Sequence, residues 1–284
     1  MSLMSKLLSV TLITTLALSA NSEVIPSKKQ IIKYIKNSVI RNPRVKVQDL
    51  EIVETKVDDR IKGWKVLFTS MDLMFQKKSI KVPIILFSNG NLLTTELYDV
   101  NTSTNFAKVL KPTIPESVYD DEHLLYGNKD AKHKILVFSD PQCPFCQDVM
   151  PDIFEAVKKH PDMFALYYYH LPLKRLHPVS ETLTKVMHIA QNGNRKDIFE
   201  DMYKLDINIR MTNEKKILSK IKKQFNYKLT KEQINAPEVL KSLKADEDTA
   251  ARLMISGTPT VYIDGKLDKF RDGYKDYLKK EDKK

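Results

Sequence analysis

The chain has 284 residues, of which 42% are hydrophobic and 29% charged, with only 7 glycines; this composition supports a buried core and excludes collagen-like, low-complexity and largely disordered chains. The formal net charge is +11, but only 8 of the 47 basic residues are arginine, the side chain that phosphate and base recognition favours. We therefore expect no nucleic-acid partner, and the length favours two domains.

Residues 1 to 20 have the pattern of a secretory signal peptide. Lys6 precedes an apolar run from Leu7 to Leu18, and the small residues Ser19 and Ala20 follow it. A membrane anchor that is not cleaved is the alternative, but the run is shorter than the roughly 20 residues that a spanning helix needs. We predict cleavage near Ala20 and export to the periplasm.

Residues 21 to 100 predict a small α+β domain. Isoleucine and valine recur at helical spacing between Ser27 and Ile40, with lysines on the opposite face. Strand-like segments follow at residues 45–57, 63–75, 79–87 and 92–98, the last two joined by a Ser-Asn-Gly-Asn turn. This stretch has no cysteine and no histidine, so we expect it to carry no catalytic group.

A second domain is predicted over residues 119 to 284, after a linker at 101–118 that holds a short helix and two prolines. The order of its first elements is strand, cysteine pair, helix, strand, which is typical of an α/β unit. Residues 178 to 255 then show helical periodicity, and a strand pair and a last helix close the chain. The predicted segments are Ile135–Phe138, Cys146–Lys159, Phe164–His170, Thr260–Ile263 and Gly273–Lys280.

The two cysteines, Cys143 and Cys146, are spaced as a redox dithiol. If a helix begins at Cys143, its free N–H groups and its dipole favour a thiolate there, and Pro144 fits the first turn. Cys143 is then the attacking thiol and Cys146 the resolving thiol. Zinc would need further ligands that the spacing does not supply, covalent haem would need histidine at position 147, and an inert local disulfide stays open. We expect no metal and no cofactor besides the dithiol.

The segment Val137–Cys146, with its Cys-Pro-Phe-Cys centre, resembles the active site of the DsbC/DsbG periplasmic disulfide isomerases. In that family Thr258-Pro259 would match the threonine and cis-proline that face the cysteines and pair with a bound peptide. The resemblance implies a thioredoxin-like α/β domain with a helical insertion. It also implies that the preceding α+β domain makes a homodimer.

Some residues depart from this pattern or are ambiguous. Many thioredoxin-fold proteins carry a buried acid where this chain has Val137, so another group must handle the Cys146 proton. Asp140 is a weak candidate because we expect it at the surface. We expect Phe145 to be exposed and to touch clients, and Tyr167–Tyr169 to lie in a core strand. The six histidines share no ligand spacing and are expected to be structural.

The predicted function is that of a periplasmic protein disulfide isomerase acting on misfolded exported proteins. Cys143 and Cys146 would carry the chemistry, Pro144 and Phe145 the active-site dipeptide, and Thr258-Pro259 the substrate contact. A membrane thiol-redox partner would set its oxidation state. A disulfide oxidase and a chaperone-like binder of unfolded chains are the alternatives.

Overall fold

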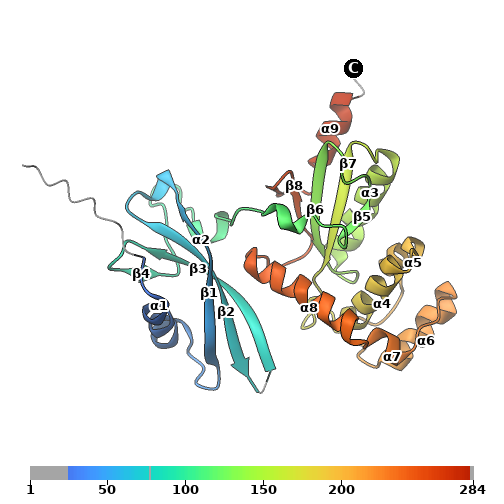
Figure 1. The fold of residues 1–284 in the computed structure, drawn as a ribbon, viewed down its shortest axis with the longest axis horizontal. Coiled ribbons are helices and arrows are strands. Elements are labelled where there is room, and N and C mark those ends of the chain that lie inside the picture. The colour runs from blue at the N-terminus through green and yellow to red at the C-terminus, as the bar shows by residue number, and fades with distance from the viewer. Residues whose placement is uncertain (1–24, 77, 282–284) are drawn as a thin grey trace, which may run out of the picture.

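The computed structural model describes residues 25–76 and 78–281, so the predicted signal peptide lies outside the described part. Within that part, no helix combines the length and apolar character needed to cross a bilayer. Two sheets form the centres of two units, which a linker joins (Figure 1).

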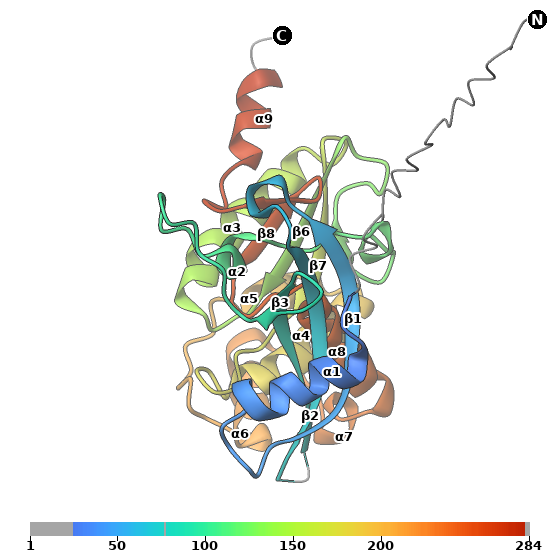
Figure 2. The same cartoon turned by 90° about the vertical axis from the view of Figure 1, so that its left-hand side faces the viewer.

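The N-terminal unit is a four-stranded antiparallel sheet in the order β1-β2-β3-β4. Its first helix begins at a capping box of Ser27 and Gln30, and Ile31 and Ile35 pack on the sheet. Figure 2 shows this helix across the outer face of β1 and β2. The helix predicted over Ser27–Ile40 ends in a π turn, and the predicted fourth strand is only two residues long. The elements are α1 (Lys28–Tyr34), the π turn (Ile35–Val39), β1 (Lys46–Val57), a 3-10 turn (Asp59–Ile61), β2 (Lys65–Phe75), β3 (Lys78–Ser88) and β4 (Leu93–Thr94).

Both faces of this sheet are covered. Leu67 and Leu86 face α1, whereas Phe68 and Phe87 face the opposite side, where Phe106 of the linker packs on them. The linker helix α2 (Phe106–Val109) begins at Asn105, whose side chain caps it, and a 3-10 turn (Glu116–Val118) follows. The linker is therefore held against the sheet by apolar contacts.

The second unit is a five-stranded sheet in the order β5-β7-β6-β8-β9. The central strands β6 and β7 are parallel, and helix α3 connects them, while the outer pairs are antiparallel. Residues 135–138 of β6 are buried, as a strand covered on both faces requires. The elements are β5 (Leu124–Tyr126), β6 (His133–Ser139), α3 (Pro144–Lys159), β7 (Phe164–His170), β8 (Thr260–Ile263), β9 (Lys266–Asp268) and α9 (Tyr274–Glu281).

A helical insertion separates β7 from β8. Its last helix, α8, lies between the two units and contacts β2 and β3 of the N-terminal sheet (Figure 1). Arg252 at its end lies 3.2 Å from Glu51, and Met254 packs with Phe68. The helices are α4 (Ser180–Asn192), α5 (Lys196–Asp201), α6 (Glu214–Phe225), α7 (Lys231–Ile234) and α8 (Pro237–Arg252). The structure thus confirms the predicted fold class: a thioredoxin-like α/β domain with a helical insertion, preceded by a small antiparallel-sheet domain.

Candidate active site

The two cysteines lie at the N-terminus of α3, directly after the central strand β6. Cys143 is the residue that precedes the helix, Pro144 fills the first helical position, and Cys146 sits in the first turn. Proline suits that position because its missing N–H has no intrahelical partner there. Both cysteines are free thiols, with 4% of Cys143 and none of Cys146 exposed. Cys143 is thus the less enclosed of the two, although both are buried.

The surroundings of Cys143 favour its thiolate. The neighbouring thiol of Cys146, then Thr258, and then the backbone amides of Cys146 and Phe145 lower the pKa of Cys143 from 9.0 to about 5 against the opposing effect of burial. Free N–H groups of a first helical turn and the helix dipole act in the same direction. Cys143 is therefore built as the attacking nucleophile at neutral pH.

The surroundings of Cys146 favour its thiol form instead of its thiolate. Burial, followed by its hydrogen bond to Cys143, raises the pKa of Cys146 far above 9.0, while the Asp140 backbone N–H and the Ser139 hydroxyl partly offset that rise. As long as Cys143 is ionised, Cys146 stays a thiol that donates to it. Its proton must leave before it can attack a mixed disulfide.

A chain of buried hydroxyls lies behind Cys146. The Ser139 hydroxyl is 2.8 Å from that of Tyr203, which is 2.6 Å from that of Tyr168, and all three residues are buried. Burial raises the pKa of Tyr168 and Tyr203, so both keep their protons. When Cys146 ionises, each hydroxyl can turn its hydrogen toward the sulfur. Sequence reasoning missed this chain of hydroxyls because Tyr203 follows α5 in the helical insertion, 64 residues after Ser139.

Asp140 does not lie at the surface, so that prediction was wrong. Its side chain is fully buried and accepts four hydrogen bonds: the Gln142 N–H at 2.8 Å, the Leu173 N–H at 2.8 Å, the Ser180 hydroxyl at 2.5 Å and His177 Nδ1 at 3.0 Å. The segment after β7 folds back over the cysteine loop and encloses it. Asp140 therefore ties that loop to the start of the helical insertion.

Thr258 and Pro259 face the cysteines from the loop before β8. The sulfur of Cys143 lies 3.4 Å from the Thr258 carbonyl oxygen, and the Thr258-Pro259 peptide bond is cis. Arg271, which the sequence did not single out, donates from Nε to the Pro259 carbonyl at 2.9 Å. The structure thus brings Cys143, Cys146, Thr258 and Pro259 together.

The remaining singled-out residues fall into two groups. Phe145 is 67% exposed beside Cys143, whereas Tyr167–Tyr169 are buried in β7, as predicted. His123 is held between Asp120 and Asp246, with nitrogen–oxygen distances of 2.6 and 2.9 Å, which is a structural arrangement. In the described residues, no three His, Cys, Asp or Glu side chains are grouped so as to bind a metal ion.

The pKa of Cys143 predicts how its reactivity depends on pH. Alkylation of the reduced protein by iodoacetamide should rise with a midpoint near pH 5 in place of 9.0. Because the folded pKa lies below the unfolded one, Cys143 ionisation stabilises the reduced fold fully above pH 9.0, and this contribution is lost as the pH falls toward 5. In Cys146→Ala, which lacks the principal donor, the midpoint should move upward. A wild-type midpoint above about pH 8 would contradict the assigned environment.

This fold and this site define a thioredoxin-fold domain with a cysteine pair at the start of the helix that follows its central strand. A sequence model described as "Thioredoxin" matches residues 120–279, more than half of the chain. The chain belongs to that family.

Comparisons with individual proteins find only distant relatives. A protein named Na(+)/H(+) antiporter NhaA 1, from Mycolicibacterium gilvum, is 25% identical over 172 residues; these are 56% of this chain and 25% of that protein, so the chain spans about a quarter of its length. Among solved structures, a thioredoxin-like oxidoreductase from Silicibacter pomeroyi is 22% identical with a TM-score of 0.48, covering 60% of this chain and 99% of that one. Oxidised BdbD from Bacillus subtilis is 18% identical with a TM-score of 0.48, covering 62% and 98% respectively.

Proposed function

We propose that the protein is a disulfide isomerase of the DsbC/DsbG type that acts on exported proteins. The observation that carries this proposal is the asymmetry of the dithiol. Cys143 precedes the helix beside the Thr258 carbonyl and has a pKa of about 5, while Cys146 lies in the first helical turn with a raised pKa. A stabilised thiolate favours the reduced form of the pair, which is the form an isomerase needs to start its reaction.

The reaction begins when the Cys143 thiolate attacks one sulfur of a client disulfide. A mixed disulfide forms, and the other client sulfur leaves as a thiolate. In isomerisation, another client thiolate attacks the client sulfur of the mixed disulfide, so the correct disulfide forms as the bond to Cys143 breaks and Cys143 leaves as a thiolate. If the client stalls, Cys146 loses its proton and attacks Cys143; the bond to the client breaks, the proton ends on the released client thiol, and the Cys143–Cys146 pair is oxidised.

The hydroxyl chain serves the resolving step. Once Cys143 is bound in a mixed disulfide it carries no charge, so Cys146 no longer faces a neighbouring thiolate. The Ser139 hydroxyl, polarised by Tyr203 and Tyr168, then donates to the developing Cys146 thiolate. The hydroxyl chain thus assists Cys146 in a protein that has Val137 at the position where many thioredoxin-fold proteins carry a buried acid.

A disulfide oxidase is the second candidate, and one observation favours it. The strong thiolate stabilisation at Cys143 also makes the oxidised pair a good disulfide donor, because donation releases that stabilised thiolate. The two functions differ in the oxidation state that the cell maintains.

The N-terminal unit and the first residues complete the proposal. We propose that residues 21 to 100 form a homodimer interface. In support, β1 is an edge strand of twelve residues with no partner on its outer side in the described part of the chain. We also propose a periplasmic location and a membrane partner that keeps the dithiol reduced.

Thiol trapping in cells tests the isomerase against the oxidase. Cells are quenched in acid, free thiols are tagged with a mass label, and the mobility of the protein is read on a gel. We expect a mostly reduced Cys143–Cys146 pair, since an isomerase must present a thiolate. A Cys143→Ser/Cys146→Ser chain marks the position of untagged protein, and a mostly oxidised pair would favour the oxidase.

A further inference from the structure

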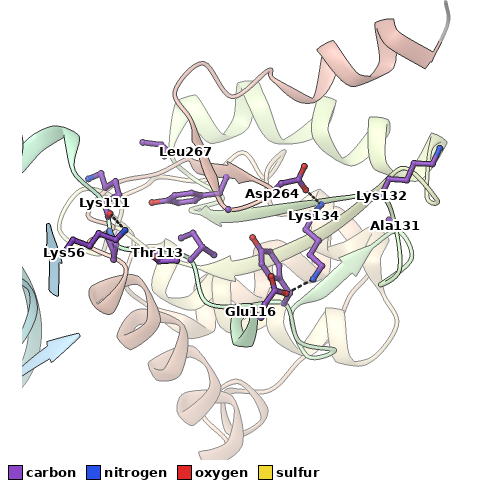
Figure 3. Close-up of a pocket in the computed structure, with 14 residues that line it drawn as sticks. Lys56, Lys111, Thr113, Glu116, Ala131, Lys132, Lys134, Asp264 and Leu267 are labelled. Carbon is purple, nitrogen blue, oxygen red and sulfur yellow. Dashed lines mark hydrogen bonds and ion pairs between the residues drawn. The ribbon is translucent and has the colours of Figure 1, made fainter. Parts of the chain in front are cut away.

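Two adjoining cavities lie along the second unit, and one of them begins at the cis-proline. The inner cavity, of about 310 Å³, is lined by Gly257 and Pro259 at one end. The outer cavity, of about 650 Å³, is lined mainly by the linker and the second unit, with Lys56 of the N-terminal unit at its edge (Figure 3). Both are lined by Lys111, Tyr262 and Leu267, so they are continuous. We call the two together the basic groove.

The inner cavity carries unneutralised positive charge. It is lined by Lys108, Lys111 and Lys269, and none of these three ammonium groups has an ion-pair partner among the described residues. The carboxylate in the same cavity, Asp268, accepts backbone N–H groups, including those of Arg271 and Gly273, at 2.9 and 2.8 Å. It is therefore occupied within its own turn and does not neutralise the lysines.

Lys111 shows this imbalance most clearly. It is half-buried at the junction of the two cavities, and burial alone lowers its pKa. Its ammonium has lost water without gaining an anion, an arrangement that costs free energy. Two lysines of the outer cavity, in contrast, have hydrogen-bond acceptors. Lys56 donates to the Lys111 carbonyl at 3.1 Å, and Lys134 pairs with Glu116 at 2.8 Å (Figure 3).

A second, independent observation lies in the wall shared by the cavities. Tyr262 is 98% buried, yet its hydroxyl has no hydrogen-bond partner within residues 25–76 and 78–281. A buried hydroxyl without a partner costs about 1–3 kcal/mol, and such groups are rare in native proteins. Burial raises the pKa of Tyr262 to about 12, so it remains a donor at neutral pH. The hydroxyl thus has a hydrogen-bonding capacity that no described residue uses.

We propose that the basic groove binds an acidic segment of the client polypeptide next to the cysteine that Cys143 attacks. This inference rests on the proposed function, because the occupant is the substrate of the same site. The groove begins at Pro259, whose neighbour Thr258 has its carbonyl 3.4 Å from the attacking sulfur. An extended chain advances about 3.3 Å per residue, so Asp or Glu a few positions from the client cysteine reach the lysines.

The test compares two labelled peptides that each carry one mixed disulfide with a small thiol. One has Asp and Glu on both sides of the cysteine, and the other has Asn and Gln at the same positions. We expect kcat/KM to be about tenfold higher for the acidic peptide at low salt, with the advantage shrinking as salt is added. The Lys108→Gln/Lys111→Gln/Lys269→Gln variant should lose this preference.

Two further variants locate the effect. The control Lys216→Gln/Lys222→Gln/Lys223→Gln removes the same charge from the exposed face of α6 and should keep the preference. Tyr262→Phe should weaken binding of the acidic peptide by a few-fold without lowering the melting temperature, because the hydroxyl has no partner to lose. A preference that survives in the groove variant, or falls equally in both triple variants, would overturn the proposal.

Failure of the groove and failure of the proposed function are distinguishable. A third peptide, acidic but with serine in place of cysteine, reports binding by fluorescence anisotropy without any chemistry. Binding that the groove variant weakens, in a protein that isomerises no client, would support the groove and reject the function. Equal exchange on the acidic and amide peptides, with equal binding, would reject the groove and leave the function standing.

Discussion

A Cys143→Ser variant should lose at least about a thousandfold in the rate of exchange with a client disulfide. Serine is nearly isosteric, but its hydroxyl does not ionise near neutral pH and forms no disulfide, so the first step cannot occur. The measurement is the release of a labelled thiol from a peptide disulfide at pH 7. The fold should survive, because serine fits the space of Cys143 and its hydroxyl can donate to the Thr258 carbonyl oxygen, which lies 3.4 Å from the Cys143 sulfur.

Cys146→Ser is the matched partner of that variant. The first step remains possible, but the resolving step does not, so the protein should accumulate mixed disulfides with clients. These appear as high-mass bands on a non-reducing gel and disappear on reduction. If Cys143→Ser retained activity, or if Cys146→Ser trapped nothing, the two roles would be wrongly assigned.

Variants of the hydroxyl chain should slow the resolving step without abolishing it. Ser139→Ala removes the hydroxyl next to Cys146, and Tyr203→Phe removes the one that polarises it. Both should slow resolution several-fold and shift its pH dependence upward, while the attack by Cys143 keeps its rate. Tyr168→Phe, one hydroxyl further away, should have the smallest effect.

An Asp140→Ala variant should lose about 3–5 kcal/mol of the free energy of unfolding. The carboxylate accepts four hydrogen bonds in a fully buried site, so its removal leaves the two backbone N–H groups, the Ser180 hydroxyl and His177 without an acceptor. Unsatisfied buried donors cost about 1–3 kcal/mol each, reduced where the site relaxes or admits water. Urea unfolding of the reduced protein measures the change.

Two comparisons make that result specific to the buried carboxylate. Asp140→Asn keeps the shape and two possible acceptor interactions, so it should be destabilised by less than the alanine variant. Asp121→Ala removes an exposed acid of the same type and should change stability by less than about 0.5 kcal/mol. A loss below about 1 kcal/mol in Asp140→Ala would mean that this carboxylate does not hold the cysteine loop in place.

Local chemistry in the sequence predicted most of the fold and the nucleophile. The strand-like segments at β2 and β3, the turn after Ser88 and the apolar strand before Cys143 are local signals, and each element lies where it was expected. Cys143 was identifiable because two cysteines three positions apart at a helix start have few other uses.

The two misses at the site share a cause, since each depends on residues distant in the chain. In the sequence, Asp140 has the position of a turn residue after a strand. No neighbouring residue in the sequence indicates that the segment from Leu173 to Ser180 encloses it. The hydroxyl chain requires Tyr203 to reach Ser139 across 64 residues. The short β4 was overestimated because Leu92–Tyr98 has strand composition, but only Leu93 and Thr94 pair with β3.

The hydroxyl chain also shapes the electrochemistry of the dithiol. Reduction takes up two electrons and, above the Cys143 pKa of about 5, a single proton, which goes to Cys146. The midpoint potential should therefore fall by about 30 mV per pH unit above pH 5 and by about 59 mV below it. Tyr168 and Tyr203 keep their protons because burial raises their pKa, so the hydroxyl chain adds no further bend to this dependence. The dithiol thus becomes a weaker oxidant in constant proportion to each rise in pH across the neutral range.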